Sequence, residues 1–144
     1  MTDVLFINPA SSKEVYQNLS EEYSAIGTPY WALLLAESCR SKGHKVKIID
    51  VLAEKLDDDT FVKRVFDIDP KLVVFCVYGE NVNGGTAYME GAVRLSKLLK
   101  DSGFQNPLAP ISFVGTYVQA LPLKVLVDEE SVDIVFTNEG VYSL

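Results

Sequence analysis

Few side chains in this sequence could act as a nucleophile, a base or a metal ligand. The only histidine, His44, stands in a Gly-His turn, and the two cysteines, Cys39 and Cys76, lie far apart in apolar stretches. Nucleophilic catalysis needs a nucleophile within reach of a base, and metal sites need clustered cysteines and histidines. Glu80 and Glu139 could transfer a proton, but a glutamate near a helix N-terminus more often accepts hydrogen bonds. We therefore expect a domain that binds a ligand, is not itself catalytic, and holds no metal through its own side chains.

The stretch 72–86 carries the strongest sign of a binding site. Six apolar residues, Leu72–Val77, are followed by the polar, glycine-rich segment Tyr78–Thr86. Such a short apolar run is typical of a strand that is buried on both faces of a parallel sheet. The segment that leaves this strand lies at the carboxyl edge of the sheet, where open α/β proteins bind ligands. We favour a binding edge over a plain connection because the segment is long and contains tyrosine and asparagine.

Five apolar stretches predict strands, and the segments between them predict helices. The strands are Asp3–Asn8, Lys45–Asp50, Leu72–Val77, Pro110–Val114 and Val132–Thr137. Helices are predicted from Thr28-Pro29 to Gly43 with Thr28 as N-cap, around residues 61–66, over 88–103, and from Pro122. Strand and helix alternate throughout, so the fold class is α/β, a three-layer doubly wound open sheet of five parallel strands.

A sheet of this kind favours the flavodoxin-like order 2-1-3-4-5, with strands numbered along the chain. That order places the topological switch point between the first and third strands. The segment Pro9–Thr28 is much longer than an ordinary connection, and we expect an ordered loop there that folds back as a lid. It would face the segment Tyr78–Thr86 across one crevice.

Composition narrows the class of protein. The chain has 144 residues, of which 48% are hydrophobic and 23% charged, as expected for one globular domain. A net charge of −7 argues against nucleic acid and anionic membranes as partners. No apolar run is long enough for a membrane helix, and the N-terminal residues lack signal-peptide features. Two unclustered cysteines fit the reducing cytoplasm, where we expect the protein to be located.

Several common ligand motifs are missing. The sequence has neither the GxGxxG of dinucleotide sites nor the GxxxxGKS/T of P-loops. A phospho-receiver needs acidic residues after its first and third strands, where this chain has Asn8 and Tyr78-Gly79. Residues 8–13 match the phosphate turn of a flavodoxin poorly. One candidate function is a flavodoxin-like module that binds a nucleotide or a protein partner.

Five segments in order resemble a known family. They read VLFINPA, TPYWALLLAESCRSKGHKVKIID, LVVFCVYGENVNGGT, ISFVGTYV and VDIVFTNEG. Over residues 3–141 the chain resembles the N-terminal cobalamin-binding domain of the radical S-adenosylmethionine enzymes. That family has a strand ending in Asn-Pro, Pro-Pro-Leu-Gly before a helix, Gly-His before a strand ending in Asp, then Gly-Gly-Pro-His and Gly-Glu-Gly-Glu.

The resemblance implies a corrinoid lying over the carboxyl edge, with its nucleotide tail reaching toward the sheet. It places at the cofactor Asn8, Pro9, Tyr78, Gly79, Glu80, Asn81, Gly84, Gly85, Thr86, Gly115, Thr116, Tyr117, Asn138, Glu139 and Gly140. Trp31 and Asn138 stand where the family has glycines, and Tyr117 stands where it has histidine. We therefore expect no protein imidazole on cobalt, with Tyr117 and Asn81 as the nearest polar groups.

The function implied by the resemblance is a cobalamin-binding module of a methyltransferase or cyclase. S-adenosylmethionine and a 4Fe–4S cluster would belong to a C-terminal radical S-adenosylmethionine domain of the same protein. Residues 1–144 would be the N-terminal part of that protein, and the isolated domain would bind cobalamin weakly. We expect residues 141–144 to fray or to pack on a neighbour. We expect a side chain at Gly115 to weaken ligand binding with little loss of stability if its φ is negative.

Overall fold

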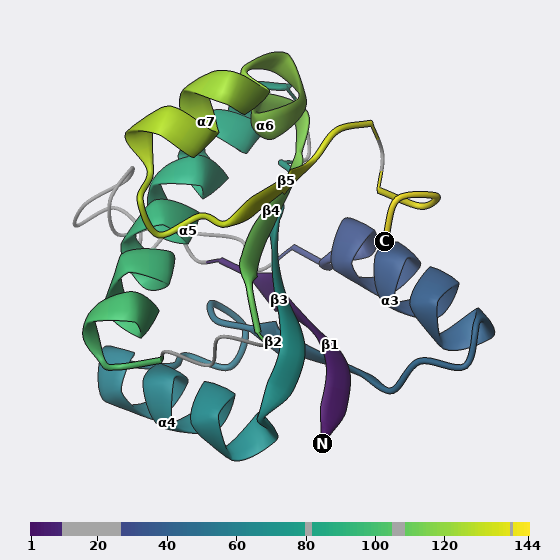
Figure 1. The fold of residues 1–144 in the computed structure, drawn as a ribbon, viewed down its shortest axis with the longest axis vertical. Coiled ribbons are helices and arrows are strands. Elements are labelled where there is room, and N and C mark those ends of the chain that lie inside the picture. The colour runs from purple at the N-terminus through teal and green to yellow at the C-terminus, as the bar shows by residue number, and fades with distance from the viewer. Residues whose placement is uncertain (10–26, 80–81, 105–108, 139) are drawn as a thin grey trace.

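The centre of the fold is a sheet of five parallel strands (Figure 1). This computed structural model describes residues 1–9, 27–79, 82–104, 109–138 and 140–144. The strands are β1 (Thr2–Asn8), β2 (Val46–Asp50), β3 (Pro70–Val77), β4 (Ile111–Gly115) and β5 (Ile134–Phe136). Their order is β2-β1-β3-β4-β5, which confirms the predicted fold class and the flavodoxin-like arrangement.

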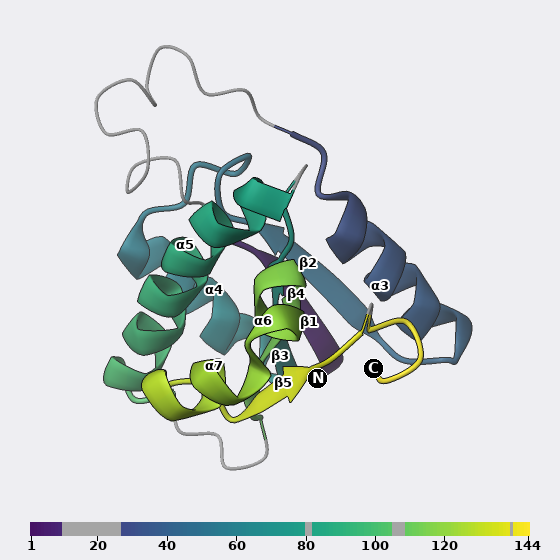
Figure 2. The same cartoon turned by 90° about the horizontal axis from the view of Figure 1, so that it is seen from above.

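Helices cover both faces of the sheet, but unequally (Figure 2). The helices are α3 (Tyr30–Ser41), α4 (Asp58–Ile68), α5 (Val82–Asp101), α6 (Thr116–Ala120) and α7 (Pro122–Asp128). α3 packs on one face, and the other described helices pack on the opposite face. The connection from β1 to β2 runs across the sheet in the direction opposite to the later ones, so right-handed crossovers place its helix on the other side. No described helix is long and apolar enough to cross a membrane.

Alternate residues of each strand supply two hydrophobic cores. In β1, Val4 and Phe6 pack with α3, whereas Leu5 and Ile7 pack in the larger core beneath α4 and α5. A strand that is buried on both faces needs apolar residues at successive positions. This requirement explains why the strands read as continuous apolar runs and could be found in the sequence.

Helix starts differ in detail from the prediction. α3 begins at Tyr30 with Pro29 as its N-cap, one residue later than predicted. The Thr28 side chain makes no cap, and its carbonyl oxygen accepts a hydrogen bond from Tyr30 N at 2.8 Å. α4 is capped by Asp57, whose carboxylate accepts a hydrogen bond from Thr60 N at 2.8 Å. That hydrogen bond lowers the pKa of Asp57 because it favours the charged form.

Two segments predicted as loops are helical. Gly84, Gly85 and Thr86 belong to α5, which begins at Val82. The poor helix propensity of glycine suggested a loop, but packing against α6 overrides it. A Cβ atom on Gly85 would lie 2.4 Å from Thr116 Oγ1, so only glycine fits this helix contact without a shift. Thr116 and Tyr117 themselves lie in α6, a short helix that the sequence did not reveal.

Gly115 is required by the sheet itself. It pairs with Val77 across β3 and β4 and has a φ of +151°. A Cβ atom there would lie 2.0 Å from the backbone oxygen of Val77. The condition under which substitution would be harmless to the fold, a negative φ, is therefore not met. Gly115 allows two strand ends to approach closely, which is a structural role.

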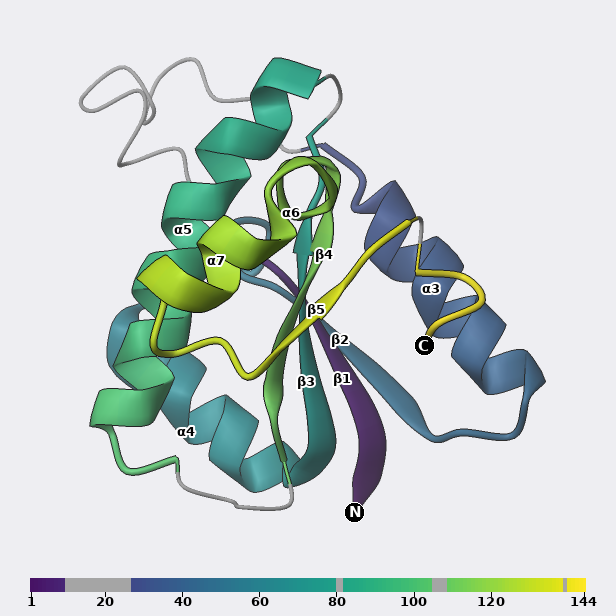
Figure 3. The same ribbon diagram turned by 45° about the horizontal axis from the view of Figure 1, so that its top comes forward.

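The last described residues pack against α3 (Figure 3). Gly140 O accepts hydrogen bonds from Ser143 N and Leu144 N, which closes a single turn. Ser38 Oγ of α3 donates to Val141 O at 3.2 Å, and Leu144 packs against the core on the α3 face. The segment thus takes its packing from a neighbouring helix, one of the two arrangements expected.

The structure predicts that Gly115→Ala destabilises the fold strongly. A side chain at such a positive φ costs about 1–3 kcal/mol, and a forced contact in a packed interior costs about 1–3 kcal/mol more. Gly43→Ala is the matched control because Gly43 has a φ of +90° but no atom within 4 Å of a Cβ. Urea unfolding of both variants measures the difference. Equal losses of unfolding free energy would contradict the assignment of Gly115 to close strand packing.

Candidate functional site

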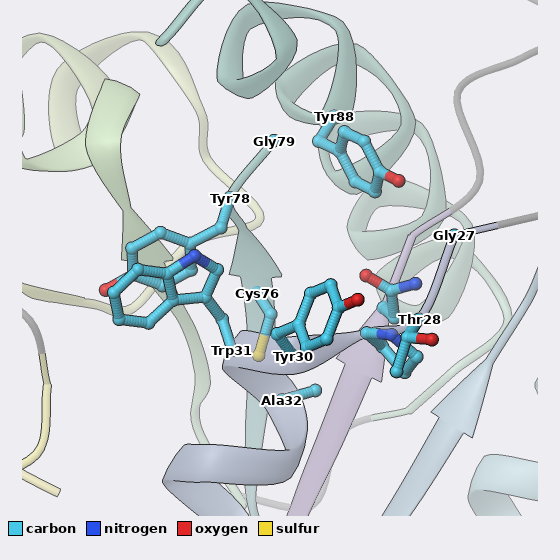
Figure 4. A pocket seen from close by; sticks show the side chains of 11 residues that line it. Gly27, Thr28, Tyr30, Trp31, Ala32, Cys76, Tyr78, Gly79 and Tyr88 are labelled. Carbon is cyan, nitrogen blue, oxygen red and sulfur yellow. The ribbon is translucent and has the colours of Figure 1, made fainter. Parts of the chain in front are cut away.

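A cavity of about 420 Å³ opens at the carboxyl edge of the sheet, beside the ends of β1 and β3 (Figure 4). Its walls come from those two strand ends and from the starts of α3 and α5. It is lined by Asn8, Gly27, Thr28, Pro29, Tyr30, Trp31, Ala32, Cys76, Tyr78, Gly79 and Tyr88. This position is the topological switch point of the sheet, the usual ligand site of open α/β folds. The predicted binding edge and the observed cavity coincide.

Four aromatic side chains line the cavity. The rings of Trp31 and Tyr78 stack with their centroids 4.4 Å apart and an angle of 16° between the planes. Trp31 comes from the first turn of α3 and Tyr78 from the residue that follows β3, so the stack joins a helix to the sheet edge. Tyr30 is 64% exposed at the mouth, and Tyr88 of α5 also lines the cavity. Flat aromatic walls of this kind suit a flat, largely apolar ligand group.

A buried amide and a buried carboxylate meet where β1 and β2 end. Asn8 and Asp50 are paired in the sheet register, and Asn8 Nδ2 donates to Asp50 Oδ2 at 3.2 Å. Asp50 Oδ1 accepts a second hydrogen bond from Ala53 N at 3.0 Å. Asp50 N donates to Glu54 Oε1, and Glu54 forms an ion pair with Arg64 of α4. These contacts hold the turn after β2 and fix the Asn8 side chain at the cavity.

The cysteine thiols are not reactive groups. Cys76 lines the cavity but is only 1% exposed, and burial raises the pKa of its thiol well above the usual range. Burial also raises the pKa of the Cys39 thiol on α3. A raised thiol pKa means that less thiolate is present at neutral pH, and the thiolate is the nucleophile and the metal ligand. The interpretation of both cysteines as core residues agrees with their burial.

Only part of the predicted site meets at the cavity. Asn8, Tyr78 and Gly79 line it, and Pro9 is buried next to Asn8 without lining it. Gly85 and Thr116 pack against each other, and Gly115 packs against Val77. Gly84 and Thr86 are residues of α5, and Thr86 is exposed. Glu80, Asn81 and Glu139 lie outside the described residues.

The described residues that were predicted after β4 and β5 do not line this cavity. Tyr117 packs against the core on the α4 and α5 side of the sheet. Asn138 is exposed with a φ of 64°. A Cβ on Gly140 would touch Val114, Leu35 and Leu144, so Gly140 belongs to the packing on the α3 face.

The residues that the prediction did not assign to the site come mostly from the start of α3. The sequence marked Thr28 and Pro29 as a helix start but gave no reason to place Tyr30 at a ligand. One signal in the sequence could have placed these residues at the site, because a helix that follows a parallel strand starts at the carboxyl edge. The sequence pattern predicts a core position for Tyr88, because this residue follows the helical period of its apolar neighbours.

His44 lies at the opposite edge of the sheet. It precedes β2, and its backbone N–H donates to Cys39 O at 3.2 Å in the turn that ends α3. Within the described ranges, no group of three or more histidine, cysteine, aspartate or glutamate side chains could hold a metal ion.

Comparisons with known proteins support the fold. No protein family model matches the chain, and no curated protein is similar in sequence. Two structures of the radical S-adenosylmethionine methyltransferase TsrM from Kitasatospora setae are similar. The one with cobalamin and a 4Fe–4S cluster bound has a TM-score of 0.60 and 16% identity over 90% of this chain. The one with tryptophan substrate and a SAM analog has a TM-score of 0.54 and 18% identity over 85%.

The chain spans less than a quarter of those proteins, 23% and 21% of their lengths. At such low identity the likeness shows a common fold. The fold and the cavity together define a parallel α/β domain with an aromatic-walled cavity at its switch point.

The burial of both thiols predicts their behaviour toward alkylating reagents. In the native protein at mildly alkaline pH, iodoacetamide should modify neither Cys39 nor Cys76, because the raised pKa and the burial both suppress the reaction. In urea both should react fully. Intact-mass measurement over time distinguishes the two states, and rapid modification of native Cys76 would show that the cavity floor is open.

Proposed function

We propose that this domain binds a corrinoid such as cobalamin at the cavity, as the cofactor-holding part of a radical S-adenosylmethionine methyltransferase or cyclase. The observation that carries the proposal is the position of the cavity. It lies at the switch point of a fold shared with a structure that contains cobalamin. S-adenosylmethionine and the iron–sulfur cluster would be bound by a C-terminal domain of a longer chain in the same, cytoplasmic protein.

The residues present fit a corrinoid in kind. A corrin is a broad, flat macrocycle whose faces are largely apolar and whose rim carries amides. Trp31 and Tyr78 offer a flat apolar wall, and Asn8 offers a buried amide. A cavity of about 420 Å³ lies within the size range of small-molecule sites. A whole cobalamin is larger, so the cavity would enclose one part, and the remainder would rest over the sheet edge.

Bound cobalamin supplies a cobalt centre that can carry a methyl group. The role of this chain would be to bind and orient the cofactor and to exclude water from one side of it. Among the described residues, the side chains at the cavity include no imidazole, and burial raises the pKa of the Cys76 thiol. The chain would therefore hold the corrinoid by packing and hydrogen bonds, without a protein imidazole on cobalt.

A second candidate function is supported by the size of the cavity. About 420 Å³ between aromatic walls also suits a single heterocycle, such as the flavin or base of a nucleotide. A fluorescence titration with each kind of ligand separates this alternative from the corrinoid.

Trp31 provides the reporter for that titration because it is the only tryptophan in the chain and lies in the cavity wall. Cyanocobalamin should quench Trp31 fluorescence saturably after correction for absorbed light. Tyr78→Ala should weaken binding at least about tenfold, since it removes the stacked wall. Leu123→Ala on α7, where the side chain is 77% exposed and does not line the cavity, is a surface control and should leave the affinity unchanged. Saturation by FMN or AMP but not by cyanocobalamin would favour the second candidate.

The absence of a histidine at this edge among the described residues gives a spectroscopic expectation. Cob(II)inamide lacks the nucleotide base, so any nitrogen on its cobalt would have to come from the protein. We expect its electron paramagnetic resonance spectrum to show no nitrogen splitting when the domain is added, and His44→Ala to bind as the wild type does. Resolved nitrogen splitting that disappears in His44→Ala would contradict this arrangement.

A further inference from the structure

The Asn8 side chain connects a buried carboxylate with the cavity. Asn8 and Asp50 are each 9% exposed, yet Asn8 lines the cavity. Asn8 Nδ2 donates to Asp50 Oδ2 at 3.2 Å. Within the part of the chain that the structure describes, no hydrogen bond reaches Asn8 Oδ1. One end of the amide is therefore engaged, and the other is available at the cavity.

The Asp50 carboxylate determines which end of the Asn8 amide is available to a ligand. An ionised carboxylate only accepts hydrogen bonds, whereas an asparagine amide has a donating nitrogen and an accepting oxygen. The amide nitrogen must therefore face Asp50, because the oxygen would place two acceptors against each other. Asp50 cannot turn away easily, since its other oxygen accepts from Ala53 N at 3.0 Å in the turn after β2.

We propose that Asp50 is a positioning residue that makes Asn8 Oδ1 a fixed hydrogen-bond acceptor, so that the cavity selects ligands with an N–H donor at this point. In a corrinoid, whose binding is the proposed function on which this inference rests, the donor is a peripheral amide. A carboxylate at the same place on the ligand brings an acceptor against an acceptor and leaves Asn8 Oδ1 desolvated and unpaired. The cavity therefore distinguishes an amide from an acid of nearly the same shape.

Asp50→Asn reverses this preference with little change of shape. The new amide oxygen at position 50 still accepts from Ala53 N, which leaves the new NH₂ group facing Asn8. Two NH₂ groups cannot bond to each other, so Asn8 turns its oxygen toward position 50. Its own NH₂ group then faces the cavity. Asn8→Ala, in contrast, removes the discriminating group without supplying a donor.

The test compares cyanocobalamin with its separate monocarboxylic acid isomers, in which a single peripheral amide is a carboxylate. The isomers carry the same charge, so repulsion from this acidic protein affects them alike, and a difference among them reports on position. We expect one isomer to bind wild type about tenfold more weakly than the others, equivalent to about 1.4 kcal/mol. Asp50→Asn should abolish or reverse that difference, and Asn8→Ala should abolish it.

Asp59→Asn is the matched control, because Asp59 is exposed on α4 and its substitution makes the same change of charge. It should keep the wild-type ranking of the isomers. Melting temperatures establish that each variant is folded, and the isomer ranking is a readout that a purely structural role of Asp50 would not move. Equal binding of all isomers by wild type, or an unchanged ranking in Asp50→Asn and Asn8→Ala, would overturn the inference alone. Failure of wild type to bind any corrinoid would overturn the proposed function and the inference with it.

Discussion

The pairing of β1 with β3 is the constraint on which the site depends. These neighbours in the sheet are separated along the chain by α3, β2 and α4. From β1 the chain crosses to one face, and from β3 it crosses to the other. The two connections therefore diverge at the carboxyl edge and leave a space between their described parts. Every residue that lines the cavity comes from the two strand ends or from the segments and helices that follow them.

The packing of α3 determines the shape of that space. The helix meets the sheet through small residues, Ala32, Ala36 and Cys39, which allow a close approach. Leu35 fills the core between them and is fully buried. Because the helix is held closely, Trp31 in its first turn reaches the end of β3 and stacks on Tyr78. The aromatic wall is thus set by packing at positions that never touch the cavity.

The fold could be predicted from the sequence because its strands and helices carry local signals. A strand such as Leu72–Val77 is apolar at every position, and periodic apolar residues mark the helices. The order of the strands followed from general rules of chain connection. The position of the cavity at the carboxyl edge followed from the same rules, and Asn8, Tyr78 and Gly79 line it.

The rest of the site depends on contacts between distant residues, which no local pattern records. The stack of Trp31 on Tyr78 and the fit of Gly85 beneath Thr116 are visible only once helices have been placed against strands. Gly115 is an example, because the sequence alone does not distinguish a glycine that makes room for a ligand from one that makes room for a neighbouring backbone. The position of the Val77 carbonyl oxygen distinguishes these roles. The hydrogen bond between Asn8 and Asp50 is easier to anticipate from the sequence, because both residues end neighbouring parallel strands in register.

The stack of Trp31 on Tyr78 has a consequence for the newly made chain. Trp31 precedes Tyr78 by 47 residues. Ribosomes add about 5–20 residues per second, so Trp31 leaves the peptidyl transferase centre about 2–9 s before its partner is made. β1 waits longer for β3, about 3–14 s at the same rate, because their register joins residues 4–7 with 72–75. During synthesis α3 thus holds an aromatic surface without its partner, and a chaperone that binds exposed apolar side chains would meet this segment before the cavity exists.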